Sequence, residues 1–195
     1  MNTENQIDEY DNLRQDCWND ALHSFGTSYI YSKRSRKIGK LLKLNNFLGI
    51  IVPVVIGGIV TSYNVSADAL QIILIIAAPI SVLQLVLSVL SLTNKWDDSY
   101  SYYLESTNDN GQLSNDYTNL AKYPPQEKSD LKTKKDIINI KYQIRNTNDT
   151  KYPLTDEEKR EGMKYSLRNF RRSCAGCNVT PTDMKSTNCG VCGNF

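Results

Sequence analysis

Residues 47–60 read FLGIIVPVVIGGIV, and residues 69–92 read ALQIILIIAAPISVLQLVLSVLSL. They lie in an apolar region, 44–94, in which Asp68 is the one charged residue. Because a helix of about 20 mainly apolar residues can cross the hydrocarbon core of a bilayer, this pattern predicts a transmembrane hairpin. The predicted spans are about 44–63 and 69–92. The alternative is a soluble bundle with two core helices, which does not explain why neither helix has a charged face.

Basic residues gather at the outer flanks of the two predicted spans. The stretch 33–43, KRSRKIGKLLK, carries six basic residues, and Lys95 follows the second span, whereas 61–68 contain neither Lys nor Arg. Lys and Arg in short flanks stay in the cytoplasm, so both ends of the chain are expected on the cytoplasmic side of a bacterial inner membrane. The basic stretch would contact anionic lipid headgroups. A nucleic-acid-binding patch is a weaker interpretation, because the position beside a span already accounts for these charges.

The N-terminal segment, 1–43, is polar, and the apolar run after it begins late and lacks a small-residue cleavage site. The first span is therefore expected to be an uncleaved anchor. Within the segment, apolar residues recur at helical steps: Ile7, Tyr10, Leu13, Cys17, Trp18, Ala21, Leu22 and Phe25. This stripe predicts an amphipathic cytoplasmic helix that packs against the helices after the second span, with Gly26 as the point where it could be interrupted.

Each predicted span carries one face of distinct composition. On the first span, small residues and a proline recur every four positions: Gly49, Pro53 and Gly57. On the second span, polar residues step by three or four: Ser81, Gln84, Ser88 and Ser91. Small residues allow helices to approach closely, and polar side chains in hydrocarbon face other helices or a water-filled cavity. The polar stripe thus predicts either helix packing or, in an assembled oligomer, the lining of a pore.

The segment 95–172 is predicted to be a cytoplasmic helical region. The run Asn108-Asp109-Asn110-Gly111 is a strong turn signal, and the apolar periodicity over 113–121 indicates a helix that ends at Tyr123-Pro124-Pro125. Residues 127–146 fit a helix or a strand, and their length and lysine-rich start favour the helix.

A further helix is predicted after residue 155. Thr155 and Glu158 have the spacing of a capping box, in which each side chain accepts a hydrogen bond from the other residue's backbone N–H. The helix that this box starts is expected to end near Arg172 and to bury three residues: Met163, Leu167 and Phe170.

The C-terminal segment, 173–195, contains two CxxC pairs separated by eleven residues: Cys174, Cys177, Cys189 and Cys192. Each pair can turn as a knuckle that offers two thiolates to one ion, and four thiolates in a tetrahedron are typical of one structural Zn²⁺. An iron site and paired disulfides are the alternatives, the latter disfavoured in a reducing cytoplasm. Gly176, Gly190 and Gly193 are expected to supply positive φ angles. Because the segment has few large apolar residues, metal binding is expected to drive its folding.

No phosphate-binding loop, dinucleotide fingerprint, HExxH or Ser-His-Asp pattern is present in the sequence. His23 is the one histidine, and a packing or surface position is expected for it. A four-thiolate site leaves no open coordination position, so it indicates structure rather than catalysis. We therefore expect no enzymatic activity and no catalytic residues.

The cysteine spacing resembles that of the bacterial mobilome CxxCx(11)CxxC proteins, which are carried on mobile elements. The order of a lead helix, two spans and trailing helices is similar to that of SLATT-type membrane effectors. That resemblance implies a role in phage defence, including systems with nucleotide second messengers, and an action by membrane permeabilisation. Function inferred in this way rests on analogy.

The sequence thus predicts an all-α membrane protein: a two-helix transmembrane hairpin, a cytoplasmic helical bundle and a small four-cysteine zinc knuckle. The leading functional hypothesis is a defence effector that oligomerises and permeabilises the inner membrane, with the lipid bilayer, copies of itself and a cytoplasmic sensor or nucleotide-signalling protein as partners. The second is a membrane-anchored interaction module that recruits a cytoplasmic partner through its helices and zinc segment. An accessory immunity or antitoxin-like protein is a third hypothesis with less support.

Overall fold

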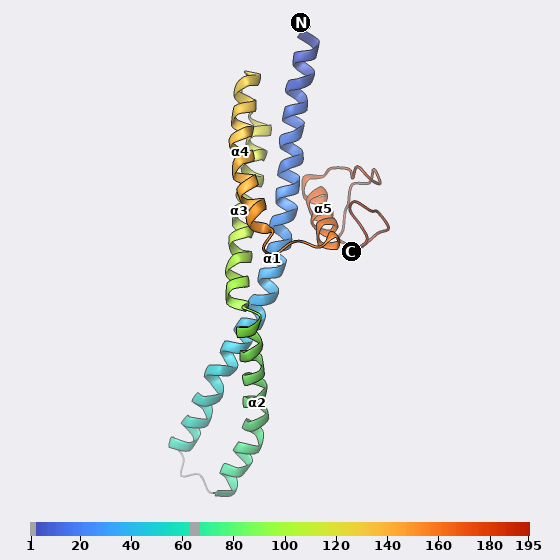
Figure 1. Ribbon diagram of the computed structural model, residues 1–195. Coiled ribbons are helices and arrows are strands. Elements are labelled where there is room, and N and C mark those ends of the chain that lie inside the picture. The colour runs from blue at the N-terminus through green and yellow to red at the C-terminus, as the bar shows by residue number, and fades with distance from the viewer. Residues whose placement is uncertain (1–2, 63–66) are drawn as a thin grey trace. The chain divides into compact units, whose positions relative to one another are not determined.

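The computed structural model describes residues 3–62 and 67–195, and this part of the chain is all-α (Figure 1). Its five helices are α1 (Thr3–Ser62), α2 (Ala67–Thr93), α3 (Trp96–Lys122), α4 (Lys128–Asp149) and α5 (Asp156–Phe170). After α5 the chain has no regular secondary structure. The all-α class predicted from the apolar periodicity is confirmed, and residues 127–146 belong to a helix.

The chain packs as two compact units. The first, here the helical unit, comprises Met1–Lys33 and Tyr103–Phe195. The second, here the hairpin unit, comprises Arg34–Tyr102. Helices α1 and α3 each contribute residues to both units.

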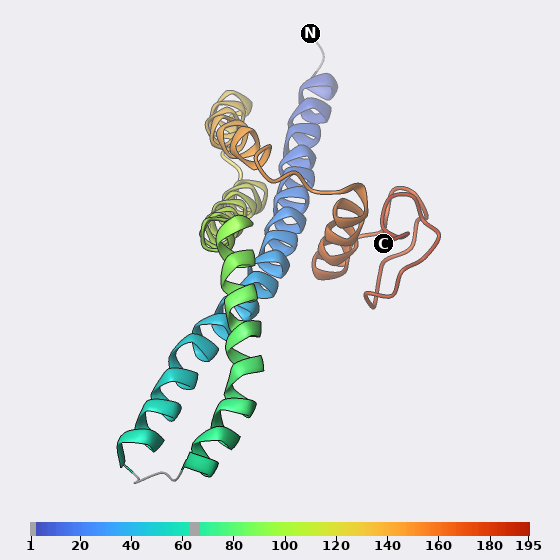
Figure 2. The same ribbon diagram turned by 60° about the horizontal axis from the view of Figure 1, so that its bottom comes forward.

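In the helical unit, α3 and α4 lie on one side of α1, while α5 and the C-terminal segment lie on the other (Figures 1 and 2). The main core lies between α1, α3 and α4 and contains Cys17, Ala21, Leu113, Tyr117, Leu120, Ala121, Leu131 and Ile138. Tyr10, Leu13 and Trp18 pack against this core. The amphipathic stripe of α1 is confirmed at these positions, and the side chain of Ile7 lies outside the described residues.

The turn predicted at 108–111 is wrong, because α3 runs through it without a break. Asn110 is buried, and its side-chain amide donates to the Ser106 carbonyl oxygen at 2.9 Å and to Asp149 Oδ2 of α4 at 3.0 Å. A turn would expose this amide, whereas the helix holds it against α4. The tertiary contact therefore overrides the local preference of Asn and Gly for turns.

Helix α5 begins with the predicted capping box, in which Thr155 Oγ1 accepts from the Glu158 N–H and Glu158 Oε2 accepts from the Thr155 N–H. Leu167 is buried, and Met163 and Phe170 are partly buried. The helix packs on α1 through an aromatic column: Tyr165 stacks on Tyr29 with ring centroids 3.8 Å apart. Gly26 does not interrupt α1, and instead lies where α5 crosses it.

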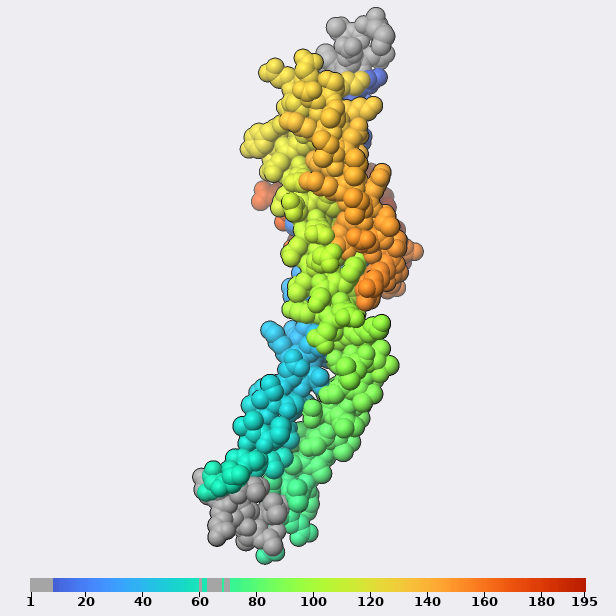
Figure 3. All heavy atoms as spheres, turned by 60° about the vertical axis from the view of Figure 1, so that its left-hand side comes forward, coloured from blue at the N-terminus to red at the C-terminus, as the bar shows by residue number. Residues whose placement is uncertain are grey.

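In the hairpin unit, the 34–62 part of α1 pairs with α2 (Figure 3). The two helices are closest near the end of α2 that leads into α3 and splay apart toward residues 62 and 67 (Figures 1 and 2). Where they are close, Ser88 Oγ donates to Asn45 Oδ1 at 3.0 Å. Both helices are long and apolar enough to cross a membrane, and 6% of each most apolar window is buried. Most of their large apolar side chains are exposed.

Candidate metal centre

The four paired cysteines come together in one cluster after α5. The ligand atoms Cys174 Sγ, Cys177 Sγ, Cys189 Sγ and Cys192 Sγ all lie within 4.8 Å of one another. The Cys174–Cys189 and Cys177–Cys192 sulfur pairs are 3.9 and 3.8 Å apart. In a zinc tetrahedron with Zn–S bonds of about 2.3 Å, neighbouring sulfurs are about 3.8 Å apart. The cluster therefore fits one metal ion, and its all-thiolate donor set is typical of Zn²⁺.

The two CxxC pairs form matching knuckles. In the first, the Gly176 N–H donates to Cys174 Sγ at 3.3 Å, and in the second the Val191 N–H donates to Cys189 Sγ at 3.4 Å. The carbonyl oxygens repeat the pattern, since Cys174 O accepts from the Asn178 N–H at 2.8 Å and Cys189 O from the Gly193 N–H at 2.9 Å. Backbone donors directed at sulfur stabilise the thiolate, which is the form that binds metal.

The prediction that glycines supply positive φ in the knuckles is wrong, since no described glycine has a positive φ. Asn178 and Asn194 adopt the left-handed conformation, with φ of 56° and 57°. Asn tolerates this conformation better than most non-glycine residues. Two of the glycines are needed for space instead: a Cβ on Gly176 would lie 2.7 Å from Val191 Cγ2, and one on Gly193 would collide with the Thr187 carbonyl oxygen. A Cβ on Gly190 would meet nothing within 4 Å.

The environment of the sulfurs differs across the cluster. Hydrogen bonds from the backbone N–H groups of Cys192 and Val191 lower the pKa of the Cys189 thiol to about 6. Burial raises the pKa of the Cys192 thiol. Cys189 is therefore more readily ionised than Cys192. The fifth cysteine, Cys17, is buried in the core of the helical unit, and burial raises the pKa of its thiol.

The metal centre is attached to the rest of the helical unit by an apolar contact. The buried side chains of Cys174 and Cys192 share a small core with Leu22 of α1 and Leu167 of α5, and Met163 packs against it. The cluster thus has one face against two helices. The segment 173–195 does not form its core alone, as its scarcity of large apolar residues indicated.

Two basic residues of α5 also bind the C-terminal segment through polar contacts. Lys164 is only 4% exposed; its ammonium group donates to the Lys185 carbonyl oxygen and lies 3.9 Å from Asp183 Oδ1. Arg160 Nε donates to the Asn194 carbonyl oxygen at 3.0 Å. Sequence reasoning missed both residues. The apolar period gives no signal for Lys164, because this residue directly follows Met163 and lies beside the Met163–Leu167–Phe170 stripe rather than in it.

The residues predicted to pack or to line a pore lie in the hairpin unit. A Cβ on Gly49 would be 3.2 Å from Gln84 Nε2, so this glycine and this glutamine face each other. Ser91 is buried, Ser88 is half-buried against Asn45, and Ser81 and Pro53 are exposed. A Cβ on Gly57 would meet nothing within 4 Å. The glycine face and the polar stripe therefore meet each other at Gly49 and Gln84.

The sequence of residues 14–195 matches the family described as Mobilome CxxCx(11)CxxC protein. This match covers nearly the whole chain and includes all four clustered cysteines. No curated protein and no solved structure matches the chain.

Proposed function

The chain belongs to the mobilome CxxCx(11)CxxC family, and we propose that it is a non-enzymatic effector of the bacterial inner membrane in a mobile-element or anti-phage defence system. In this proposal the protein stays inactive until a cytoplasmic partner or ligand changes its assembly. It then oligomerises and permeabilises the membrane. Permeabilisation needs several copies, because two helices cannot enclose a water path.

The observation that carries the proposal is the exposure of the hairpin unit's apolar side chains. Residues such as Ile50, Val54, Ile75 and Leu85 are each more than 60% exposed. A soluble monomer rarely exposes a contiguous apolar surface of this kind, whereas lipid covers it without cost. Between Lys43 and Lys95, Asp68 is the one charged residue, so neither apolar helix has a charged face. Both observations favour a membrane hairpin over two core helices of a soluble bundle.

The order of elements supports the effector assignment. Along the chain, the amphipathic lead segment and the first apolar segment form one helix, α1, which is followed by the apolar helix α2 and by trailing helices. This order is similar to that of SLATT-type effectors. The basic stretch 33–43 and Lys95 lie at the ends of the apolar helices that lead into the helical unit. The helical unit is accordingly proposed to be cytoplasmic, where its thiols stay reduced and available to Zn²⁺.

A membrane-anchored interaction module is the second candidate, and the packing of the polar stripe favours it. Gln84 faces Gly49, and Ser88 donates to Asn45, so these polar groups serve contacts within one chain. In the effector, a change of assembly would have to turn this stripe toward water. In the anchor, the stripe stays between α1 and α2, and the helical unit recruits a partner.

Membrane leakage after induction separates the two candidates. We expect expression together with the native neighbouring genes, under phage challenge, to cause dye entry and loss of membrane potential. Gln84→Leu makes α2 more apolar, so it should insert normally but abolish leakage if the stripe lines a water path. Thr93→Leu, at an exposed position of α2 outside the stripe, is the matched control and should leak like wild type. A harmless wild type under these conditions would contradict the effector and leave the anchor.

A further inference from the structure

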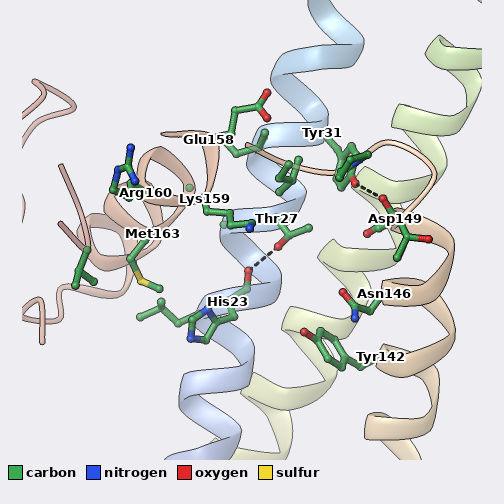
Figure 4. Close-up of a pocket in the computed structure, with 18 residues that line it drawn as sticks. His23, Thr27, Tyr31, Tyr142, Asn146, Asp149, Glu158, Lys159, Arg160 and Met163 are labelled. Carbon is green, nitrogen blue, oxygen red and sulfur yellow. Dashed lines mark hydrogen bonds between the residues drawn. The ribbon is translucent and has the colours of Figure 1, made fainter. Parts of the chain in front are cut away.

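A cavity of about 450 Å³ opens in the helical unit between α1, α4 and α5 (Figure 4). This volume lies within the range of small-molecule sites in proteins, about 300–1,000 Å³. The cavity is separate from the interior of the cysteine cluster, although Val191 of the second knuckle lines its edge. Neither the family match nor the proposed membrane action assigns a role to it.

The carboxylates that line the cavity are already engaged by the protein. Asp149 Oδ1 accepts from Arg145 Nη2 at 2.8 Å and from Ser106 Oγ at 2.8 Å, and its Oδ2 accepts from Asn110. Glu158 Oε2 accepts from the Thr155 N–H in the capping box. Asp149 therefore has Arg145 as a cation partner, and Glu158 caps the start of α5.

The remaining polar lining is rich in hydrogen-bond donors. Figure 4 shows His23 on α1, with Tyr142 and Asn146 of α4 facing α1 across the cavity. Thr27 also lines the cavity, but its hydroxyl donates to the His23 carbonyl oxygen at 3.1 Å. Two basic residues of α5, Lys159 and Arg160, also line the cavity, and Arg160 Nε already donates to the Asn194 carbonyl oxygen, so Lys159 is the cation we assign to a ligand. Its ammonium group lies 3.0 Å from Asp156 Oδ1, but both side chains are well exposed. An exposed pair of this kind contributes little and can be exchanged for a ligand.

Apolar side chains form the rest of the wall, with Leu22 and Ile30 from α1, Met163 from α5 and Val191 from the knuckle. A ligand that fills the cavity therefore needs an anionic or acceptor group that pairs with Lys159 and the hydrogen-bond donors. It also needs an apolar or flat portion that packs against the apolar wall. Tyr142 offers a ring on which a flat body can stack.

We propose that this cavity binds a small organic anion, a phosphate ester or a carboxylate, whose acid group pairs with Lys159 and whose ring or apolar body lies between α1 and α4. His23 and Asn146 donate to the polar groups of the ligand. Since α1 continues from this cavity into the hairpin unit, the site lies on an element shared by both units. The binding itself does not depend on the proposed membrane action.

The test uses the zinc-loaded full chain in a non-ionic detergent, titrated by calorimetry with adenosine 5′-monophosphate and with phenyl phosphate. Adenosine and phenol, which lack the acid group, are the neutral controls. Both anions should bind, and each should bind at least about tenfold more tightly than its neutral control, since a charge-assisted hydrogen bond gives on the order of a tenfold gain or more.

Three variants make the test specific. Lys159→Met and Asn146→Ala, both at exposed positions, should each fold normally and weaken the binding of the anions, by about tenfold for Lys159→Met. Lys132→Met, which removes an exposed lysine of α4 outside the cavity, should leave the affinity unchanged. Absence of binding at anion concentrations of about 10 mM, or equal affinities for wild type and Lys159→Met, would overturn the proposal. Leakage in cells is not a readout here, so failure of this site and failure of the effector hypothesis are distinguishable.

Discussion

Gly26 of α1 and Gly162 of α5 meet backbone to backbone. A Cβ on Gly26 would lie 2.8 Å from the Gly162 carbonyl oxygen, and a Cβ on Gly162 would lie 2.8 Å from the Gly26 carbonyl oxygen. Both are shorter than Cβ contacts in folded proteins. The crossing brings α5, and with it the metal centre, against α1, and the stacked rings of Tyr29 and Tyr165 lie along the same contact.

This crossing predicts the effect of adding a methyl group. Gly26→Ala should lower the free energy of unfolding of the helical unit by about 1–3 kcal/mol, because overpacking exceeds the gain in helix propensity. Gly111→Ala in α3 is the matched control: its Cβ would lie 3.4 Å from Ser28 Oγ, an ordinary contact, so this variant should be neutral or more stable. Chemical denaturation followed by circular dichroism measures both. Equal stabilities of the two variants would contradict the close approach.

The metal centre predicts about one Zn²⁺ per chain of purified protein. Cys189→Ser should lose most of the metal, because three thiolates hold it less well and the C-terminal segment depends on it. Cys17→Ala should keep the metal, since Cys17 lies in the α1–α3–α4 core rather than in the cluster. Elemental analysis with thiol counting before and after chelation is the measurement. Iron absorbance, or a thiol count that chelation leaves unchanged, would refute the zinc assignment.

The hairpin unit predicts different results for two glycines of one helix face. Gly49→Leu should separate α1 from α2, because its side chain would collide with Gln84, which lies 3.2 Å from the Cβ position. Gly57→Leu should leave the pair intact, since nothing lies within 4 Å of its Cβ. Chemical cross-linking between copies of the protein in membranes measures how much oligomer each variant forms. A loss of oligomers in Gly57→Leu alone would place this glycine at a contact between copies, and loss in neither variant would argue against close packing at this face.

Substitution of Arg145 of α4 is predicted to cause a large loss of stability. It is 4% exposed and donates to Glu105, Asp109 and Asp149 at 2.8–3.0 Å. Arg145→Met would remove the charge-assisted hydrogen bonds to the partly buried carboxylate of Asp149, so the free energy of unfolding should fall by about 3–5 kcal/mol. Lys141→Met, which removes an exposed pair with Asp116, should change it by less than about 1 kcal/mol. Denaturant midpoints of the two variants provide the comparison, and similar midpoints would count against the network.

The orientation in the membrane is a further prediction. Reporter fusions at residues 1 and 195 should be cytoplasmic, and a reporter inserted at residue 65 should be periplasmic, because the basic residues flank the spans on the other side. Lys95→Gln should weaken this preference less than neutralising the six basic residues of 33–43. A periplasmic C-terminus would be incompatible with both the orientation and a reduced four-thiolate site.

Features encoded within a few neighbouring residues could be predicted from the sequence. The apolar stripe of α1, the capping box of Thr155 and Glu158, the stop at Pro124 and the clustering of the cysteines all follow from such local patterns. Each depends on the period of a helix, on a hydrogen bond within one turn, or on a short loop that brings two knuckles together. The sequence therefore determined most of the helical structure and the four-cysteine donor set of the candidate metal centre.

Only the tertiary structure decided the features that need partners far along the chain. Asn110 stays helical because Asp149, 39 residues later, receives its amide, and Gly26 serves a helix crossing because Gly162 is opposite. The cavity beside Lys159 exists because three helices converge on it. In the C-terminal segment the left-handed residues are Asn178 and Asn194, whereas Gly176 and Gly193 lie where Val191 and Thr187 occupy the space that a side chain would need. The helix preference of residues such as Asn and Gly is worth at most about 1 kcal/mol per residue. Leaving a single buried polar group without its hydrogen-bond partner costs more than this, so the tertiary contact decides the local conformation.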